Sequence, residues 1–217
     1  MDIGKAFTFV LDDEDKIIKL LIGAIVAIIP IVNLAGLGYM VQLVRNVRDD
    51  QETPLPTWED FGNYFMDGLK VFVGMLVYSL PLILLICVFG VVLIGVNNIP
   101  DRQAAEGIMI VMIICLSCFT LFFSLIPFIA LPALVAYFAE TAEMAAMWRV
   151  GEIWSFIQAD IGSYAILLLV ALIAIFLIAP LGGIACGIGI FITNWYAYLI
   201  FGHLTGQLAR NNDMLVI

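Results

Sequence analysis

The sequence has few charged residues, and long stretches of it have none. Asp, Glu, Lys and Arg make up 12% of its 217 residues. None of them occurs in residues 71–100, 107–139 or 161–209, and residues 17–44 contain only Lys19. Hydrophobic residues make up 64% of the chain, and the mean hydropathy is +1.11. A water-soluble core of this size cannot bury so much apolar surface, so the sequence predicts a protein whose apolar runs form helices in a bilayer.

Side chains that could perform acid–base or nucleophilic chemistry are also scarce. His203 is the only histidine in the sequence, and neither an H-E-x-x-H nor a G-x-S-x-G motif occurs. An intramembrane hydrolase needs at least two convergent reactive groups, so we expect no enzyme and no catalytic residue. A membrane histidine can ligate haem or chlorophyll, but one without a carboxylate nearby in the sequence more often hydrogen-bonds across a helix pair. We therefore expect no cofactor, with His203 only as a speculative ligand.

The cysteines and the acidic residues exclude two further classes of site. Cys115 and Cys118 have C-x-x-C spacing, but zinc needs two more ligands and the sequence offers none nearby. Such a pair in an apolar helix is typical of packing residues, so we expect no metal site. The net charge of −9 repels phosphate backbones and argues against nucleic-acid binding. The expected partners are the lipid bilayer and other membrane protein subunits or a second copy of the chain.

The apolar runs are too long to be one straight span each. Residues 17–44 would form a helix of about 42 Å, whereas the hydrocarbon core is about 30 Å thick. Proline and glycine predict breaks or bends at 29–38, Pro81, Pro127, Pro132 and 180–183. The sequence therefore predicts an all-α fold, a polytopic transmembrane helical bundle of about five to six membrane segments, with Pro- and Gly-broken helices in a single integral membrane domain, 1–217.

The placement of the prolines suggests two repeated halves, residues 17–96 and 107–209. Each half reads as an apolar run with an Ile-Pro pair, a polar loop with aromatic residues and a second apolar run with a proline. Internal repeats are common in multi-pass membrane folds. The halves share little identity, so a chance match stays open as the alternative.

Two polar loops predict amphipathic helices that lie at the membrane interface. Thr57 and Asp60 have the spacing of a capping box, and apolar residues recur at helical spacing after them and again after Met147. The residues of the two patterns are Trp58, Phe61, Phe65, Leu69 and Phe72, then Met147, Val150, Trp154, Ile157 and Ile161, with Trp148 beside them. We expect Trp58, Phe61, Phe65, Trp148 and Trp154 to be interfacial anchors; a docking surface for a partner is the alternative.

Small and polar residues inside the apolar runs are expected to serve helix packing and hydrogen bonding. Gly183 and Gly187 form a G-x-x-x-G pattern, and Gly202 and Gly206 form another, which predicts close helix packing. The polar residues could line a polar path, but they more often hydrogen-bond loosened backbone or neighbouring helices. They are Asn33, Ser79, Ser117, Thr120, Ser124, Thr193 and Asn194.

The basic residues favour one membrane topology over another. If every run crosses once and the last run crosses twice, Lys and Arg are divided evenly between the two sides. If residues 17–44 instead turn back as a short hairpin, every basic residue except Arg102 lies on the side of both termini. Positive residues collect on the cytoplasmic side. We therefore expect a re-entrant or thin hairpin, with the N- and C-termini cytoplasmic.

Four short motifs in the first half resemble the pattern of a known family. They are Gly38-Tyr39, Arg45-Asn46-Val47, Leu55-Pro56-Thr57-Trp58-Glu59-Asp60-Phe61 and Asp67-Gly68-Leu69-Lys70. In these motifs, and in His203-Leu204 and Gly206-Gln207, the sequence is similar to an uncharacterised prokaryotic family of multi-pass integral membrane proteins, domain of unknown function 4013. The resemblance implies the inner membrane of a bacterium or archaeon. It implies no activity, because the family has none assigned.

Three functional hypotheses are compatible with these patterns. We favour a non-enzymatic multi-pass membrane protein that packs with or organises other membrane components, as a structural or accessory subunit of a membrane complex. The first alternative is a transporter or permease component for an apolar or zwitterionic solute, which a cavity lined by Asn33, Ser79 or Asn194 would favour. The second is a pigment- or haem-binding subunit of a redox or photosynthetic complex, which depends on His203 alone.

Overall fold

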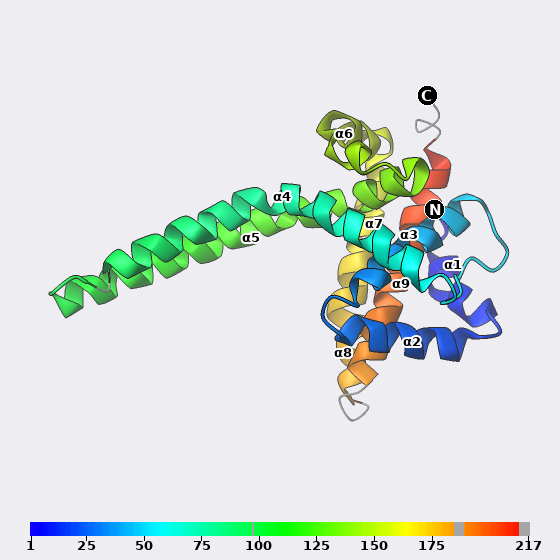
Figure 1. Ribbon diagram of the computed structural model, residues 1–217, viewed down its shortest axis with the longest axis horizontal. Coiled ribbons are helices and arrows are strands. Elements are labelled where there is room, and N and C mark those ends of the chain that lie inside the picture. Colours follow the sequence, from blue (N-terminus) through cyan, green and yellow to red (C-terminus); the bar gives the residue numbers. More distant parts are fainter. Residues whose placement is uncertain (97, 185–188, 213–217) are drawn as a thin grey trace. The chain divides into compact units, whose positions relative to one another are not determined.

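The computed structural model describes residues 1–96, 98–184 and 189–212 (Figure 1), and every regular element in them is helical. The predicted all-α class is therefore confirmed. The chain forms two compact units. Unit 1 comprises Met1–Gly74 and Pro132–Ile217, and unit 2 comprises Met75–Leu131.

Three helical stretches in the described residues are long and apolar enough to cross a membrane. They are α4 (Phe61–Val96), α5 (Arg102–Thr141) and the stretch Ile161–Leu181. The last comprises α7 (Ile161–Ile173), a π-helical turn η3 (Ala174–Ile178) and α8 (Ala179–Leu181). These helices indicate a membrane protein, as the composition predicts.

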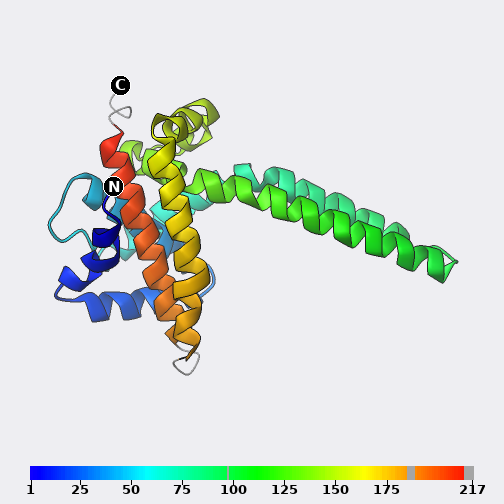
Figure 2. The ribbon, with the colours of Figure 1, turned by 180° about the vertical axis from the view of Figure 1, so that it is seen from behind.

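Unit 2 is a helical hairpin with almost no interior. Its two arms, the later part of α4 and the earlier part of α5, run side by side in both views (Figures 1 and 2). Almost none of the most apolar stretch of either helix is buried within the protein. The charged residues of unit 2 are Asp101, Arg102 and Glu106, all at the tip of the hairpin. A surface of this kind is stable only where lipid or other apolar partners surround it.

The helices continue through three prolines, at one of which, Pro81, we predicted a bend and at two of which, Pro127 and Pro132, we predicted interruptions. Pro81 lies inside α4, and Pro127 and Pro132 lie inside α5. The predicted interruption of residues 107–139 is therefore wrong. In an apolar helix that lacks competing water, neighbouring groups and small local adjustments compensate for the hydrogen bond that each proline removes.

The other two predicted breaks are confirmed. The first apolar run divides into α2 (Lys16–Ile28) and α3 (Leu34–Arg48), with Ile31 between them in the left-handed region at φ 71°. The last run divides at the predicted glycines, because α8 ends at Leu181, the 3₁₀ turn η4 (Gly182–Ile184) follows and α9 begins at Gly189. Before Pro180 the helix winds as the π-helical turn η3. A proline clashes with the carbonyl of the residue four positions earlier, and a π-helical turn gives that carbonyl room.

Unit 1 is built around α9 (Gly189–Asn211). Helix α3 packs along α9, and α2, α7 and α8 also contact it (Figures 1 and 2). Most side chains of α9 from Trp195 to Ala209 are buried. At the N-terminus, α1 (Ile3–Thr8) and the 3₁₀ turn η1 (Phe9–Asp12) add Phe9 to this core.

The two polar loops fold differently from the predicted amphipathic helices. Helix α4 begins at Phe61 rather than at Thr57, so Trp58 precedes the helix. In the second loop a 3₁₀ turn η2 (Met144–Trp148) is followed by α6 (Val150–Ala159). Helix α6 buries Ile153, Phe156 and Ile157 and leaves Val150 and Trp154 exposed, so the predicted apolar set is divided between two faces.

Asp160 separates α6 from α7 and explains part of that difference. Its carboxylate accepts a hydrogen bond from the backbone N–H of Ser163 at 3.0 Å and caps α7. Hydrogen bonds from the side chain and backbone of Ser163 lower the pKa of the Asp160 carboxyl below its usual range. The cap favours the charged form and therefore weakens as the pH falls through that lowered pKa. Ile161 consequently belongs to a new helix.

Candidate functional site

Two glycines bring the backbones of α3 and α4 into direct contact. A Cβ atom on Gly38 would lie 1.8 Å from the carbonyl oxygen of Tyr64, and one on Gly68 would lie 1.7 Å from that of Leu34. Real Cβ atoms do not come so close to other atoms. The crossing of α3 and α4 therefore requires glycine at both positions, one in the Gly-Tyr motif and one in the Asp-Gly-Leu-Lys motif.

An aromatic cluster forms next to this crossing. The rings of Tyr39 and Trp58 stack with centroids 4.4 Å apart, and the hydroxyl of Tyr39 donates to the carbonyl oxygen of Pro56 at 2.7 Å. Trp195 of α9 lies 5.5 Å from the Tyr39 ring and 5.8 Å from the Trp58 ring. Aromatic rings at these separations add to the free energy gained by their burial. Three elements far apart in the sequence are thus joined by their aromatic residues.

The indole of Trp195 is held by two further glycines. A Cβ atom on Gly23 of α2 would lie 2.1 Å from Nε1 of Trp195, and one on Gly36 of α3 would lie 3.1 Å from its Cζ3. Gly36 therefore provides a packing surface inside α3 and does not break the helix, contrary to our prediction.

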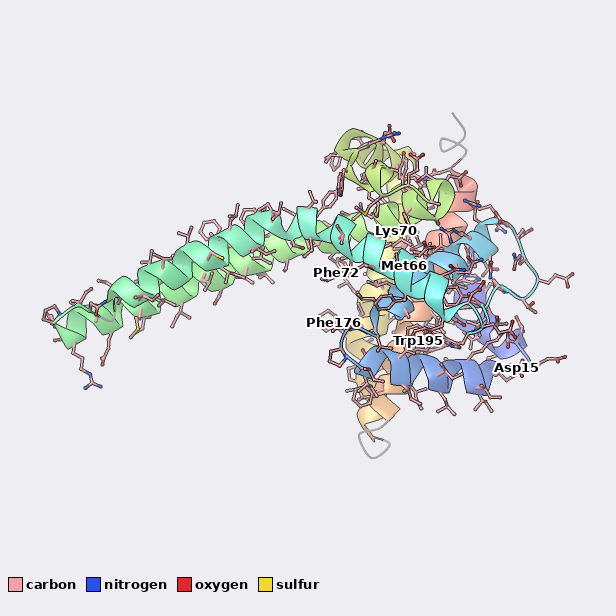
Figure 3. The ribbon with its side chains drawn as sticks, in the orientation of Figure 1. Asp15, Met66, Lys70, Phe72, Phe176 and Trp195 are labelled. Carbon is pink, nitrogen blue, oxygen red and sulfur yellow. The ribbon has the colours of Figure 1, made fainter. Side chains whose placement is uncertain are left out.

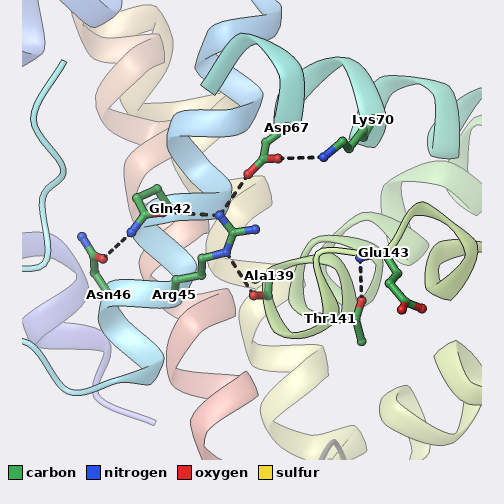
Figure 4. A network of polar contacts seen from close by, with 8 residues as sticks. All are labelled: Gln42, Arg45, Asn46, Asp67, Lys70, Ala139, Thr141 and Glu143. Carbon is green, nitrogen blue, oxygen red and sulfur yellow. Dashed lines mark hydrogen bonds and ion pairs between the residues drawn. The ribbon is translucent and has the colours of Figure 1, made fainter. Parts of the chain in front are cut away.

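A polar network lies at the same crossing of helices (Figure 4). Arg45 donates through Nη1 to Oδ2 of Asp67 at 2.9 Å and through Nε to the carbonyl oxygen of Ala139 at 3.0 Å. Ala139 is in the last turn of α5, and the backbone N–H four residues later, that of Glu143, donates instead to Oγ1 of Thr141. Arg45 therefore caps a carbonyl that the helix leaves without its usual partner.

The network also neutralises and packs its charges. Lys70 lies 3.4 Å from the other carboxylate oxygen of Asp67, and both Arg45 and Lys70 lie over the ring of Phe138. The side chains of Arg45 and Asp67 are 21% and 17% exposed, so solvent screens their ion pair only in part. The network ties α3, the first turns of α4 and the end of α5 together.

A cavity of about 400 Å³ is lined in part by Trp195. Its walls are the end of α2, the turn after it, the first turns of α3, Phe72 of α4 and three residues of α9. Figure 3 labels two wall residues, Phe72 and Trp195. Two asparagines line it, Asn33 from the turn and Asn194 from α9. No charged residue is among its described lining residues.

Several polar groups around this cavity lack some of the hydrogen bonds that they could make. Asn33 stands at the N-cap position of α3 but makes no capping hydrogen bond with its side chain. Asn194 donates through Nδ2 to the carbonyl oxygen of Ile190 at 2.8 Å, which leaves its own carbonyl oxygen free to accept. In the walls, Nε1 of Trp195 and the hydroxyl of Tyr198 are buried without a hydrogen-bond partner in the described part of the chain. Such groups cost about 1–3 kcal/mol each and call for a functional explanation.

His203 is buried and its ring is held in one orientation. The ring stacks on Phe9 with centroids 4.3 Å apart. The amide of Gln207 is fixed by Asp2, because Asp2 N–H donates to Oε1 at 2.6 Å and Nε2 donates to the Asp2 carbonyl oxygen at 2.9 Å. Nε2 of Gln207 also lies 3.1 Å from Nδ1 of His203, so it is the donor in that contact too. The neutral imidazole therefore carries its proton on Nε2.

This tautomer does not fit metal or haem ligation. A ligating histidine coordinates through one nitrogen and donates the N–H of the other to an acceptor. In His203 the Nδ1 atom faces a donor, and Nε2 holds the proton that a metal would have to displace. No group of three or more His, Cys, Asp or Glu residues within the described ranges is placed to hold a metal ion.

The sequence-predicted packing glycines have different surroundings. Cβ atoms on Gly202 and Gly206 would lie 3.0 Å from Met40 and 2.6 Å from Val47, so both glycines face α3. Among the described residues, no atom lies within 4 Å of such a Cβ position at Gly183. Gly187 lies outside the described residues.

The predicted anchor residues also differ among themselves. Trp58 and Phe65 pack against the core of unit 1, and Nε1 of Trp58 donates to the carbonyl oxygen of Lys19. Phe61, Trp148 and Trp154 are exposed, Trp154 by 58%. An interfacial role therefore stays a prediction for all five and is compatible with the exposure of these last three.

Most residues of the site were not singled out from the sequence as functional. Gly23, Gly36 and Trp195 make contacts whose partners are far away in the chain, and nothing local signals them. In the sequence, the Gly-Tyr and Asp-Gly-Leu-Lys motifs indicate only a resemblance to a family. In both, the glycine adjoins a residue that makes a long-range hydrogen bond, Tyr39 with Pro56 and Asp67 with Arg45, and this juxtaposition is the signal that could have identified them.

Comparisons with known proteins agree with that resemblance. No curated protein and no solved structure matches the chain. A family model described as "Protein of unknown function (DUF4013)" matches residues 21–188, which is more than half of the chain and includes α3, α4 and the motifs at their crossing. The chain belongs to this family of proteins of unknown function, DUF4013.

Proposed function

We propose that the protein is a non-enzymatic multi-pass membrane protein that packs with other membrane components, as a structural or accessory subunit of a membrane complex. The observation that carries the proposal is the hairpin of unit 2. It exposes apolar side chains along both arms and has charged residues only at its tip. Two helices without an interior of their own gain stability by packing against further helices in the bilayer.

The surroundings of the reactive groups support a non-enzymatic role. His203 is stacked on Phe9 and hydrogen-bonded by Gln207, so Nδ1 is not available as a base. Several charged residues of unit 1 are paired with one another, among them Arg45 with Asp67 and Lys19 with Asp13. The first pair connects α3 with α4, and the second joins α2 to the turn before it. Charged groups engaged in such pairs are less available for catalysis.

We propose five to six membrane segments with both termini in the cytoplasm of a prokaryotic cell. The segments are α4, α5, α7 with α8, α9 and the broken pair α2–α3 as a re-entrant hairpin. The hydrogen bonds between Asp2 and Gln207 support a common side for the two terminal regions. All Lys and Arg residues except Arg102 belong to unit 1, and Arg102 is at the hairpin tip of unit 2, which fits the positive-inside rule. Exposed Trp148 and Trp154 fit an interfacial position.

Cysteine labelling of intact cells is expected to place Asp50 and Gln103 on opposite faces. In a variant whose four native cysteines are replaced, a membrane-impermeant maleimide should label a cysteine at Gln103 from outside. A cysteine at Asp50 should react only after the membrane is opened, because the positive-inside rule puts its neighbours in the cytoplasm. Equal labelling of the two positions from outside would contradict the re-entrant hairpin.

Native mass spectrometry after gentle extraction tests the accessory role directly. We expect the protein to be recovered with a defined partner or as an oligomer, because the arms of unit 2 lack packing within the chain. A variant with Leu84→Ser and Phe122→Ser, on exposed positions of the two arms, should lose that association. The matched control Leu169→Ser changes an exposed position of α7 instead. A monomer in every preparation would count against the role.

A transporter or permease component for an apolar or zwitterionic solute is the second candidate. The cavity lined by Asn33 and Asn194 favours it, since these are two of the three residues whose presence in a cavity is expected to favour transport. The third, Ser79, donates to the carbonyl oxygen of Met75 in its own helix. The absence of charged residues from the described lining favours an uncharged solute over an ion.

A further inference from the structure

The cavity beside Trp195 has the size and surface of a small-molecule site. Its volume of about 400 Å³ lies within the range of ligand pockets, about 300–1,000 Å³. Most of its lining is apolar, from Leu34, Leu37, Phe72 and Trp195. All described lining residues belong to unit 1, so one compact body forms the whole site.

The residues that line the cavity include two exposed asparagines and a buried tryptophan. Asn33 and Asn194 are exposed, whereas Trp195 is 3% exposed and forms a closed wall. An asparagine side chain offers a carbonyl acceptor and two N–H donors, so it can pair with an amide, an ester or a hydroxyl. Asn33 makes no capping bond, and the carbonyl of Asn194 is free to accept.

The described lining of the cavity offers no charge that could pair with an ionic ligand. No Lys, Arg, Asp or Glu is among the described residues that line the cavity. A charged group taken from water into such surroundings would lose its hydration without gaining an ion-pair partner. The occupant must therefore be uncharged at the part that enters the cavity.

Residues that line the cavity also contact residues of the family motifs. Trp195 lines the cavity and also contacts the rings of Tyr39 and Trp58, and Gly36 lines the cavity and packs against Trp195. The break between α2 and α3, with Ile31 in the left-handed region, contains Asn33. Non-helical backbone in a membrane protein is tolerated where it is buried in protein or lines a cavity, and Asn33 in this break lines the cavity.

We propose that this cavity binds an uncharged amphiphile, whose apolar body lies against Phe72 and Trp195 and whose amide, ester or hydroxyl group lies between Asn33 and Asn194. Such a molecule can come from two sources, the glycerol-ester region of a membrane lipid or a free solute. The proposal rests on the membrane location proposed above and gives the second candidate function its ligand class.

Photolabelling of the purified full-length protein in detergent tests the site. One probe is a monoacylglycerol with a diazirine in its acyl chain, and the other is a diazirine-bearing N-alkyl acetamide. Peptide mass spectrometry should locate the label in the segments that line the cavity, and unlabelled probe should compete for it. Saturable labelling by the monoacylglycerol alone identifies a lipid site, and by the acetamide alone a solute site. Labelling by both supports the shared chemistry.

Variants separate the cavity from ordinary lipid contact. Leu37→Trp fills the cavity and should reduce labelling of its walls at least tenfold, whereas Leu169→Trp, on an exposed position of α7, should leave it unchanged. Asn33→Leu and Asn194→Leu change exposed residues, so the protein should fold, and each should weaken labelling about fivefold to tenfold. A photoactivatable hydrocarbon without a polar group should give no saturable labelling of the wild type.

Label spread evenly over α4, α5 and α7 and unaffected by Leu37→Trp would overturn the proposal, as would no saturable labelling by either probe. Alkaline extraction distinguishes that failure from failure of the membrane location. A protein that stays in carbonate-washed membranes but lacks saturable labelling contradicts the cavity proposal alone. Release from the membranes by carbonate contradicts the membrane location itself.

Discussion

Replacing Gly68 by alanine is expected to destabilise unit 1 by about 3 kcal/mol or more. The new Cβ atom would lie 1.7 Å from the carbonyl oxygen of Leu34 and 2.9 Å from the backbone nitrogen of Gly38. Both contacts are with backbone, so no side chain can rotate away and α3 and α4 must separate. Overpacking of this kind costs at the upper end of the usual range.

The thermal unfolding midpoint in detergent measures this effect. A loss of 3 kcal/mol corresponds to a decrease of about 6–12 °C for a chain of this size. The matched control is Gly62→Ala in the same helix, since a Cβ at Gly62 would have nothing within 4 Å. Alanine is the better helix former, so the control should be neutral or slightly stabilising. A Gly68→Ala midpoint within 2 °C of the control would contradict the close crossing.

Asp67→Asn is the second substitution with a large expected effect, about 2–3 kcal/mol of destabilisation. The variant leaves Arg45 and Lys70 without the carboxylate that both contact. The pair is mostly buried, and removing one member of such a pair leaves a poorly solvated charge. Arg45 would still cap the carbonyl oxygen of Ala139, which keeps the loss below that of a fully buried pair.

A double variant and an exposed pair provide the controls. Removing the guanidinium as well, in Asp67→Asn with Arg45→Met, should restore part of the stability because no uncompensated charge remains at Arg45. Glu152→Gln breaks the exposed pair of Arg149 and Glu152 and should cost less than about 0.5 kcal/mol. Equal unfolding midpoints for Asp67→Asn and Glu152→Gln would show that the network of Figure 4 contributes no more than a surface pair.

The helical class, the membrane character and two breaks could be predicted because they depend on local sequence. The residues from Ile29 to Asn33 and the pair Gly182-Gly183 interrupt their runs through their own backbone chemistry. The effects of Pro81, Pro127 and Pro132 could not be predicted in the same way. Whether a proline breaks a helix depends on how its surroundings satisfy the freed carbonyl, and that is a property of the tertiary structure.

The site was predicted far less well than the fold because its contacts are non-local. Trp195 meets Gly23 and Gly36, and Arg45 meets Asp67 and Ala139, so each contact joins separate helices. A glycine that permits a crossing has the same local sequence signal as a glycine that bends a helix. Asn33 and Asn194 were identified as polar residues in apolar runs, but only the three-dimensional structure places them in the same cavity.

The central place of α9 has a consequence for biogenesis. The ribosome makes this helix after α2 and α3, yet α9 supplies the surface against which both of them pack. At ordinary rates of translation, about 5–20 residues per second, α3 waits on the order of ten seconds or more for Trp195 to emerge. During that interval lipid, the insertion machinery or a chaperone must cover the nascent apolar faces. Translation stalled before α9 is complete should therefore yield a chain that is targeted to the membrane but remains open to proteolysis.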